Sequence, residues 1–390
     1  MHSVRRLAMH VIVLERYPSS QRGGQERSLL DVTRTLSDRG HHIALIHTHP
    51  GNLLPQYSLF CDQILTVRTL SLGKNWRSPL WFIQDLLKIS RQIRVATAQS
   101  DSLIYINQPY DIPFAAILSV IKQLPIVCHL RLPAPKKLGL QCTLGLRCVN
   151  QFISVSQVNC EGWKTRFNVP ITVVHNGMVP DRFDRTCSQN ELKQRWRIAA
   201  DDRVICYVGR LDHMKGLGSL LQAFAQVLRN QPQSLLLIAG KPLQSHESYG
   251  IELEQLSQTL GISDRVKFLG HVDTPIEIFH ISDLTIVPSQ WAEPCARSII
   301  ESMMAGTPVI ASRVGGNVEL LSDEFSSGLF AAGNIEDLVQ TIEAHLHWRS
   351  NDPGLGDRVK AYAQRRFNLA DKLDDIEKVL VNTVAKSIGN

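Results

Sequence analysis

No apolar run in the sequence approaches the length of about 18 residues that a helix needs to cross a bilayer. A signal-peptide pattern is missing too, because the short basic stretch Met1–Arg6 leads into Ala8–Leu14, which is typical of a strand. Both absences argue against a membrane-spanning or secreted protein. We therefore expect a cytoplasmic protein.

Cysteine pairs are also missing. The eight cysteines are scattered and form neither a C-x-x-C motif nor a zinc-ligand spacing, which is typical of reduced thiols in the cytosol. Internal repeats and low-complexity segments are absent, so a repeat protein is excluded. With 44% apolar residues, a chain of this length has sizeable cores and roughly one to three domains.

Acidic residues are scarce in the first half of the chain. Residues 1–183 hold 21 Lys and Arg against 10 Asp and Glu, which gives a net charge of +11. The remaining residues hold 21 Lys and Arg against 26 Asp and Glu, which gives −5. A basic first half favours an anionic acceptor or an anionic membrane surface as a partner. Ordinary surface charge is the alternative, and we expect no nucleic-acid partner.

One segment of this basic half carries aromatic and aliphatic side chains as well. Residues 76–98 interleave Trp, Leu and Ile with Arg77, Lys88, Arg91 and Arg94. The pattern fits a basic amphipathic helix that rests peripherally on the inner face of a membrane. It also fits a crossover helix packed on the sheet, which is the interpretation that we favour.

Short apolar runs alternate with helical patterns along the chain, which predicts parallel sheets of the α/β class. In the first half, strands are predicted at Ala8–Leu14, Ile43–Thr48, Leu103–Asn107, Ile126–Leu130, Phe152–Val155 and Thr172–His175. In the second half, they are predicted at Val204–Val208, Leu235–Ala239, Val266–Leu269, Leu284–Pro288 and Val309–Ala311. We therefore expect two Rossmann-like, doubly wound domains that face each other across a cleft.

The domain junction is predicted within residues 176–200, which are polar and turn-like. This gives a first domain over 1–183 and a second over 184–369. A last helix over 370–390 has no strand after it.

Two carboxylates flank a predicted helix start in Glu293-Pro-Cys-Ala-Arg-Ser-Ile-Ile-Glu301, which leads on to Gly315-Gly316. Pro294 suits the first turn of that helix. Eight helical residues span about 12 Å, a length that suits a nucleotide sugar with one glutamate near its sugar and the other near its ribose. The helix N-terminus between them favours a diphosphate.

These residues resemble the E-x7-E signature of retaining glycosyltransferase family 4, whose members have the GT-B fold. The resemblance covers most of the chain and is strongest from Arg203 to Glu319. It implies that Glu293 is a catalytic residue that binds hydroxyls of the donor sugar, and that Glu301 binds the ribose. It also implies that the final helix crosses back onto the first domain.

The resemblance extends to the start of the same helix. It implies that Ala296, Arg297 and Ser298 bind the donor. The family usually has Gly at the position of Ala296. Alanine keeps the backbone amide for a phosphate but leaves less room near the sugar.

Two cations follow a predicted strand in Gly209-Arg210-Leu-Asp-His-Met-Lys215-Gly216. Arg210 and Lys215 suit a diphosphate and would stabilise the charge that develops as it leaves. Taken alone, the two residues would be a surface pair. Their similarity to the family's G-R-x-x-x-x-K-G element implies that both bind the donor's phosphates and act in catalysis.

Gly23 and Gly24, within Arg22-Gly-Gly-Gln-Glu26, open a helix after the first strand. The motif is not G-x-G-x-x-G, so it does not argue for a dinucleotide. Taken alone, it is a simple helix-entry loop. In the family, two glycines at this place lie beside the donor sugar and phosphates.

His129 ends the predicted strand Pro125–Leu130, and active sites form at the carboxyl ends of parallel strands. A histidine on a strand is more often a core residue, but the resemblance implies a catalytic place on the O6 side of the sugar. Arg131 either contacts the acceptor or a phosphate, or decorates the loop 131–139.

Weaker resemblances complete the pattern. Gly315-Gly-Asn-Val-Glu319 is similar to the family's G-G-x-x-E, which shapes the loop beside the phosphates. Val272 lies where the family holds the nucleobase. Asn176-Gly177 is similar to an N-G-V-D element with its aspartate displaced to Asp181, so we favour a plain turn here.

We therefore predict a hexosyltransferase that uses a nucleoside-diphosphate sugar and a glycan or lipid-linked acceptor, as in polysaccharide biosynthesis. No D-x-D occurs that could hold a divalent cation, so we expect neither a metal nor another cofactor. Two alternatives stay open: a nucleotide-sugar epimerase of the same fold, and a catalytically silent binding subunit. The sequence identifies neither the sugar nor the base.

Overall fold

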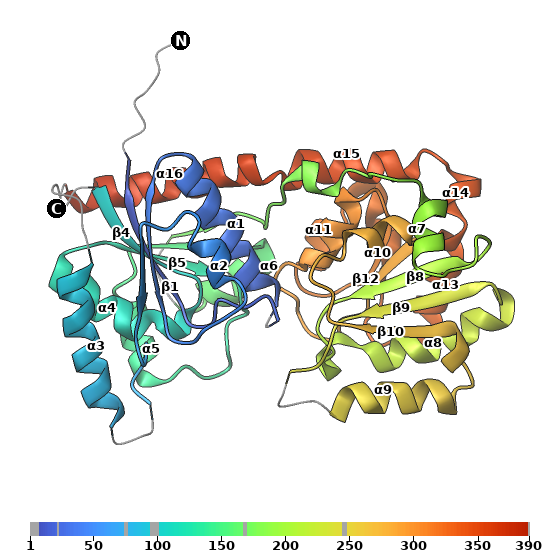
Figure 1. The fold of residues 1–390 in the computed structure, drawn as a ribbon, viewed down its shortest axis with the longest axis horizontal. Coiled ribbons are helices and arrows are strands. Elements are labelled where there is room, and N and C mark those ends of the chain that lie inside the picture. Colours follow the sequence, from blue (N-terminus) through green and yellow to red (C-terminus); the bar gives the residue numbers. More distant parts are fainter. Residues whose placement is uncertain are drawn as a thin grey trace, which may run out of the picture. The chain divides into compact units, whose positions relative to one another are not determined.

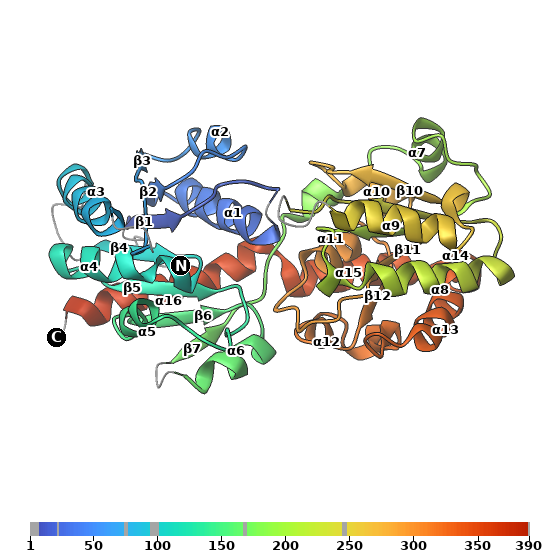
Figure 2. The ribbon, with the colours of Figure 1, turned by 90° about the horizontal axis from the view of Figure 1, so that it is seen from below.

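The computed structural model describes residues 8–21, 23–73, 77–93, 101–166, 170–243 and 248–388. Its contacts divide the chain into two compact units, one of Met1–Asn176 with Ala370–Asn390 and the other of Gly177–Leu369. Each unit is built on its own parallel sheet (Figures 1 and 2). The two Rossmann-like sheets that we predicted are therefore confirmed.

The first unit has a seven-stranded sheet in the order β3-β2-β1-β4-β5-β6-β7. Its strands are β1 (His10–Glu15), β2 (His42–His47), β3 (Gln63–Thr66), β4 (Ser102–Ile106), β5 (Ile126–Leu130), β6 (Gln151–Ser154) and β7 (Ile171–Val173). Its helices are α1 (Gly24–Asp38), α2 (Leu54–Tyr57), α3 (Ser78–Gln92), η2 (Pro109–Asp111), α4 (Ile112–Lys122), α5 (Leu140–Leu146), α6 (Gln157–Lys164) and α16 (Leu369–Ile388). Edge strand β3 escaped prediction because its residues are only half-buried or exposed and lack a clear apolar run.

The second unit has a six-stranded sheet in the order β10-β9-β8-β11-β12-β13. Its strands are β8 (Arg203–Val208), β9 (Ser234–Ala239), β10 (Val266–Gly270), β11 (Leu284–Val287), β12 (Val309–Ser312) and β13 (Leu329–Phe330). Its main helices are α7 (Gln189–Arg195), α8 (Leu217–Asn230), α9 (Ser248–Thr259), α10 (Ile276–Ile281), α11 (Arg297–Met304), α12 (Asn317–Leu320), α13 (Ile335–Leu346), α14 (Trp348–Asn351) and α15 (Leu355–Phe367). Short 3-10 turns include η3 (Pro180–Phe183) and η4 (His213–Lys215).

The boundary between the units lies earlier than the expected position after residue 183. Met178 forms a bridge with Asn368, and its amide donates to the carbonyl of Phe367 over 2.8 Å. A side chain on Gly177 would lie 2.7 Å from the Cα of Leu369. These contacts attach residues 177–183 to the second unit, and the polarity of the segment could not reveal them.

Helix α3 matches the favoured interpretation of the basic segment, because it connects β3 to β4 and buries Phe82, Leu86 and Ile89 in the core of the first unit. Trp76 and residues 94–98 of the segment lie outside the described residues. Among the described helices, none is both long enough and apolar enough to span a bilayer.

Helix α16 is joined to the first unit by a group of charged side chains. Arg39 donates through Nη1 to Asp374 and to Glu377, over 2.6 Å in each case. Nε2 of His41 lies 3.3 Å from Glu377, and Nδ1 of His41 accepts the amide hydrogen of Met9 over 3.1 Å. Since Nδ1 accepts, Nε2 carries the hydrogen that is directed to Glu377.

Replacing Glu377 by Ala should lower the free energy of unfolding by roughly 2–4 kcal/mol, because it leaves a buried histidine and a mostly buried arginine without this acceptor. Urea unfolding followed by tryptophan fluorescence measures the loss. Asp375→Ala is the matched control on α16, since its partner Lys378 is exposed, and it should cost less than about 0.5 kcal/mol. Equal losses in both variants would contradict the assigned role of Glu377.

Candidate functional site

Three of the predicted donor residues lie at one edge of the second sheet. Strands β8 and β11 are neighbours in this sheet although β9 and β10 come between them in the chain. The order of connections reverses there, and ligands of open α/β sheets bind outside such a point. Arg210 and Lys215 follow β8, and Glu293 follows β11, so all three lie at this place in the fold.

Lys215 and Glu293 form a direct ion pair. Nζ of Lys215 contacts Oε1 of Glu293, and the hydroxyl of Ser289 donates to the same oxygen over 2.7 Å. Only 5% of the surface of Glu293 is exposed. Nζ also lies 5.6 Å from the ring centre of Trp291. The structure thus joins the two motifs that the sequence separates.

Two glycines allow this approach. Gly216 has φ 72°, and a Cβ there would lie 2.0 Å from the carbonyl oxygen of Pro288. Gly315 has φ 55°, and a Cβ there would lie 2.3 Å from the carbonyl oxygen of Glu293. Any larger residue would push the loops after β8 and β12 away from the loop after β11. The glycines therefore hold the ion pair in place.

Arg210 has a carboxylate partner of its own. Its Nη2 lies 3.7 Å from Oδ2 of Asp212, and its carbonyl accepts the hydroxyl hydrogen of Tyr207 over 2.7 Å. Burial, followed by the nearby charge of Glu293, raises the pKa of Tyr207 well above its ordinary value. Tyr207 is therefore a neutral donor that fixes the backbone at Arg210.

Helix α11 begins later than expected. Its first residue is Arg297 and its N-cap is Ala296, so Pro294 lies before the helix and our placement of it in the first turn was wrong. The amide of Gly316 donates to the carbonyl of Glu293 over 2.6 Å, which holds that residue in the preceding loop. The first N–H groups of α11 are those of Arg297 and Ser298.

Glu301 lies one turn after the start of α11 and contacts Arg297, the first residue of the helix. Nε of Arg297 donates to Oε1 of Glu301 over 3.2 Å, and both side chains are mostly buried. Ala296 is also buried. Val272 is half-buried in the loop after β10, the edge strand of the sheet.

His129 occupies the carboxyl end of β5 in the first unit and is buried. Its Nδ1 lies 2.5 Å from the hydroxyl of Tyr105 and 3.3 Å from Nη2 of Arg131. Arginine can only donate, so Nδ1 is the acceptor and the hydrogen of His129 is on Nε2. Burial, followed by the charge of Arg131, lowers the pKa of His129 well below its ordinary value. His129 is therefore a neutral donor through Nε2.

Arg131 connects His129 to other polar residues of the same edge. Its Nε donates to Asn107 and its Nη1 donates to Asn176, over 2.6 Å in each case. Asn107 in turn donates to Glu15 over 3.4 Å. These contacts favour a role for Arg131 in positioning its neighbours over a place on the surface of the loop. Asn176 serves as one of its hydrogen-bond acceptors.

Glu15 is the buried acid of this network. Burial, followed by the charges of Glu26 and Asp111, raises the pKa of Glu15 well above its ordinary value. Asn107 also donates to the carbonyl of Gln25 over 3.4 Å, which attaches the start of α1 to the network. Gly23 is the N-cap of α1 and Gly24 its first residue, whereas Arg22 lies outside the described residues.

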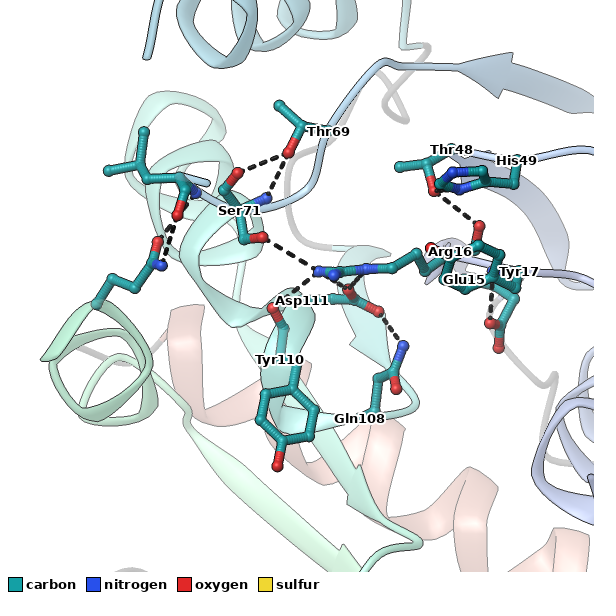
Figure 3. A network of polar contacts seen from close by, with 12 residues as sticks. Glu15, Arg16, Tyr17, Thr48, His49, Thr69, Ser71, Gln108, Tyr110 and Asp111 are labelled. Carbon is teal, nitrogen blue, oxygen red and sulfur yellow. Dashed lines mark hydrogen bonds and ion pairs between the residues drawn. The ribbon is translucent and has the colours of Figure 1, made fainter. Parts of the chain in front are cut away.

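A second network joins the loops of the same unit (Figure 3). Arg16 donates through Nη2 to Asp111 over 2.9 Å, to the carbonyl of Tyr110 over 3.2 Å and to Ser71 over 3.4 Å. Asp111 also accepts from Gln108 over 2.8 Å. Burial raises the pKa of Asp111, against the opposing effect of Arg16. These contacts tie the end of β1 to the turn after β4.

Several of these residues were not predicted from the sequence, among them Ser289, Trp291, Tyr105, Asn107 and Glu15. A polar residue that immediately follows a buried strand could have been identified from the sequence, because such positions lie at the carboxyl edge of a parallel sheet. Tyr105 gives no such signal, because it lies inside the apolar run of β4. Within the described ranges, no group of three or more His, Cys, Asp or Glu could hold a metal.

Nitrogen-15 NMR of the imidazole should find His129 as the neutral Nε2–H tautomer at pH 7 and still neutral at pH 5.5, because burial and Arg131 oppose protonation. Tyr105→Phe should leave the tautomer unchanged, since Arg131 still donates to Nδ1. Comparison with His129→Gln assigns the signal. A hydrogen on Nδ1 would contradict the assignment.

Each unit is similar to a known protein family. The family model "Glycosyl transferases group 1" matches residues 188–366, and "Glycosyltransferase Family 4" matches residues 22–182. An uncharacterized glycosyltransferase of Methanocaldococcus jannaschii is 32% identical over 60% of this chain and 59% of its own length. The N-acetyl-alpha-D-glucosaminyl L-malate synthase of Bacillus anthracis is 24% identical over 90% of this chain and 91% of its own.

A solved structure has the same fold. The Anabaena protein HepE, determined in complex with UDP and glucose, superposes with a TM-score of 0.81 at 24% identity, over 96% of this chain and all of its own. The chain spans less than two thirds of the length of several relatives that it matches, 59% in one case and 45% in another. The two family models cover both units in turn, and the chain belongs to glycosyltransferase family 4, as its motifs indicate.

Proposed function

We propose that this protein is a retaining glycosyltransferase that moves a hexose from a nucleoside-diphosphate sugar to an acceptor hydroxyl. The observation that carries the proposal is the convergence of Lys215, Glu293 and Ser289 just before α11. Membership of the family agrees with it. UDP-glucose is the first donor to test, since HepE was also solved with that compound.

The ion pair suits a ligand that carries a diphosphate beside a sugar. Phosphate oxygens accept hydrogen bonds from an ammonium group, and sugar hydroxyls donate them to a carboxylate. Lys215 and Glu293 present these two groups in contact with each other. We assign the phosphates to Lys215, Arg210 and the backbone amides of Ala296–Ser298, and the sugar to Glu293.

The reaction that we propose is front-face substitution. The bond from the anomeric carbon to the diphosphate oxygen breaks while the acceptor oxygen bonds to that carbon from the same side. The acceptor's proton passes to the leaving phosphate oxygen, so the products are a glycoside of retained configuration and a nucleoside diphosphate. The cations and amides act by stabilising the charge on the leaving group.

The remaining site residues stay predictions that rest on the family resemblance. Glu301 would bind the ribose and Val272 the nucleobase. His129, Gly23 and Gly24 belong to the first unit, and we expect them to serve the donor sugar, with His129 acting through its Nε2–H. The acceptor would be a glycan or a lipid-linked molecule, as in polysaccharide biosynthesis.

Arg210→Ala and Lys215→Ala should each reduce turnover of donor and acceptor by roughly a hundredfold or more, because each removes a partner of the charge that develops. Release of nucleoside diphosphate in the presence of acceptor measures this, and it also separates a transferase from an epimerase. Arg229→Ala is the matched control, since this exposed cation lies in the last turn of α8. Near-normal turnover in either site variant would overturn the phosphate site.

Thermal shift separates binding from chemistry in the same variants. UDP at 100 times its dissociation constant should stabilise the wild type by about 2.7 kcal/mol. The Lys215→Ala protein should stay folded but melt at a lower temperature than the wild type without ligand, because the buried Glu293 loses its partner, and it should lose most of the shift that UDP causes.

Activity should persist in EDTA. The sequence has no D-x-D motif, and the described residues hold no group of three or more His, Cys, Asp or Glu side chains that could bind a metal. In the proposed site, Lys215, Arg210 and the amides of α11 take the place of a divalent cation. Turnover is measured with and without EDTA after dialysis. Complete loss that Mn²⁺ alone restores would contradict this prediction.

A further inference from the structure

The first unit exposes a group of large apolar side chains on three neighbouring helices. Helix α3 contacts α4, and α4 contacts α5. The exposed members are Leu80, Ile83 and Leu87 of α3, Ile117, Val120 and Ile121 of α4, and Leu140 and Leu144 of α5. We call this set the three-helix surface. Most of the large apolar side chains that are exposed among the described residues belong to it.

The topology of the sheet explains why these helices lie together. The chain runs outward from β1 to β3, then crosses to β4 and continues in the opposite direction through β5 and β6. Right-handed crossovers place helices of these two directions on opposite faces of the sheet. Figure 1 shows α3, α4 and α5 on one side of the strands and α16 on the other.

The exposed side chains do not serve the core of the unit. Each helix already packs a separate inward stripe on the sheet, with Phe82 and Leu86 from α3, Phe114 and Leu118 from α4, and Leu146 from α5. Helices α3 and α4 also carry a second, outward-facing row of apolar side chains, in which Val120 has 74% of its surface exposed. An apolar surface of this extent on a water-exposed face indicates an interaction site.

Charge identifies the occupant. The acidic residues between positions 63 and 160 are Asp85, Asp101 and Asp111. Asp85 is buried and paired with Arg68, and Asp111 is buried and paired with Arg16. Asp101 precedes β4 and belongs to none of the three helices. The three-helix surface therefore has no exposed carboxylate of its own.

Cations surround the apolar side chains instead. Arg77, Lys88 and Arg91 are exposed on or beside α3, and Lys137 and Arg147 are exposed before and after α5. Apolar side chains framed by cations match an anionic bilayer, whose acyl region takes the former and whose headgroups pair with the latter. A second copy of this chain fits poorly, because two such surfaces would oppose cations without acids between them.

We propose that the three-helix surface docks the first unit on an anionic lipid bilayer. The inference deepens the proposed function in one respect, since a docked enzyme would meet an acceptor carried on lipid. The sequence suggested membrane contact only for the basic segment around α3. The proposed surface also includes α4 and α5, whose few charges make them look like ordinary core helices in the sequence.

The test is cosedimentation of the whole protein with vesicles of phosphatidylcholine alone or mixed with phosphatidylglycerol. We expect at least tenfold stronger partitioning onto the anionic vesicles, and a loss of that preference as salt rises from about 0.05 to 0.5 M, since charge attraction is screened. Ile83→Gln/Val120→Gln/Leu144→Gln should reduce partitioning at least tenfold. So should Lys88→Gln/Arg91→Gln/Arg147→Gln.

The control replaces apolar side chains that are also exposed but lie elsewhere, Ile251→Gln on α9 and Val381→Gln on α16. Partitioning of this variant should equal that of the wild type. Equal or negligible binding of the wild type to both vesicle types overturns the proposal, as does equal loss in the control. A dimer that only the apolar triple variant dissociates would overturn it in favour of self-association.

The result is independent of the catalytic proposal. Turnover of a soluble acceptor should be the same in all these variants and in the wild type. If vesicle binding follows the expected pattern but neither the wild type nor any variant transfers sugar, the docking surface stands and the proposed activity fails. If turnover is normal and vesicle binding is absent, the reverse holds.

Discussion

The ion pair between the partly exposed Lys215 and the buried Glu293 is the contact on which the organisation of the second unit's edge depends. A buried charge is stable only when its partner is held close, because separating the two leaves an uncompensated charge away from water. The loops that carry them must therefore keep a fixed spacing. The contacts of Gly216 with Pro288 and of Gly315 with Glu293 supply that spacing through the backbone itself.

The two units use their sheet edges in different ways. The second presents full charges of both signs, held by short loops after β8 and β11. The first buries a chain of hydrogen bonds that runs from Glu15 through Asn107 and Arg131 to His129 and ends in a neutral donor. Both arrangements follow from parallel strands, whose carboxyl ends collect the loops of distant segments at one edge.

Much of the architecture could be predicted from the sequence because fully buried parallel strands are continuous apolar runs, as in Leu235–Ala239. The half-exposed β3 and the very short β13 lack that signal. In the candidate site, Lys215 and Glu293 could be named from motifs. Their mutual contact, the hydroxyl of Ser289 and the late start of α11 could not, because they depend on which loops meet in three dimensions.

The path of the chain has a consequence for biosynthesis. The first unit consists of residues 1–176 together with the final helix, whose Glu377 accepts from Arg39 and His41. A ribosome makes α16 only after the whole second unit has been made. The second unit is continuous in sequence and can complete its fold while translation proceeds, since domains generally fold as units. The first unit, although begun earlier, would be completed only after the second unit has been synthesised.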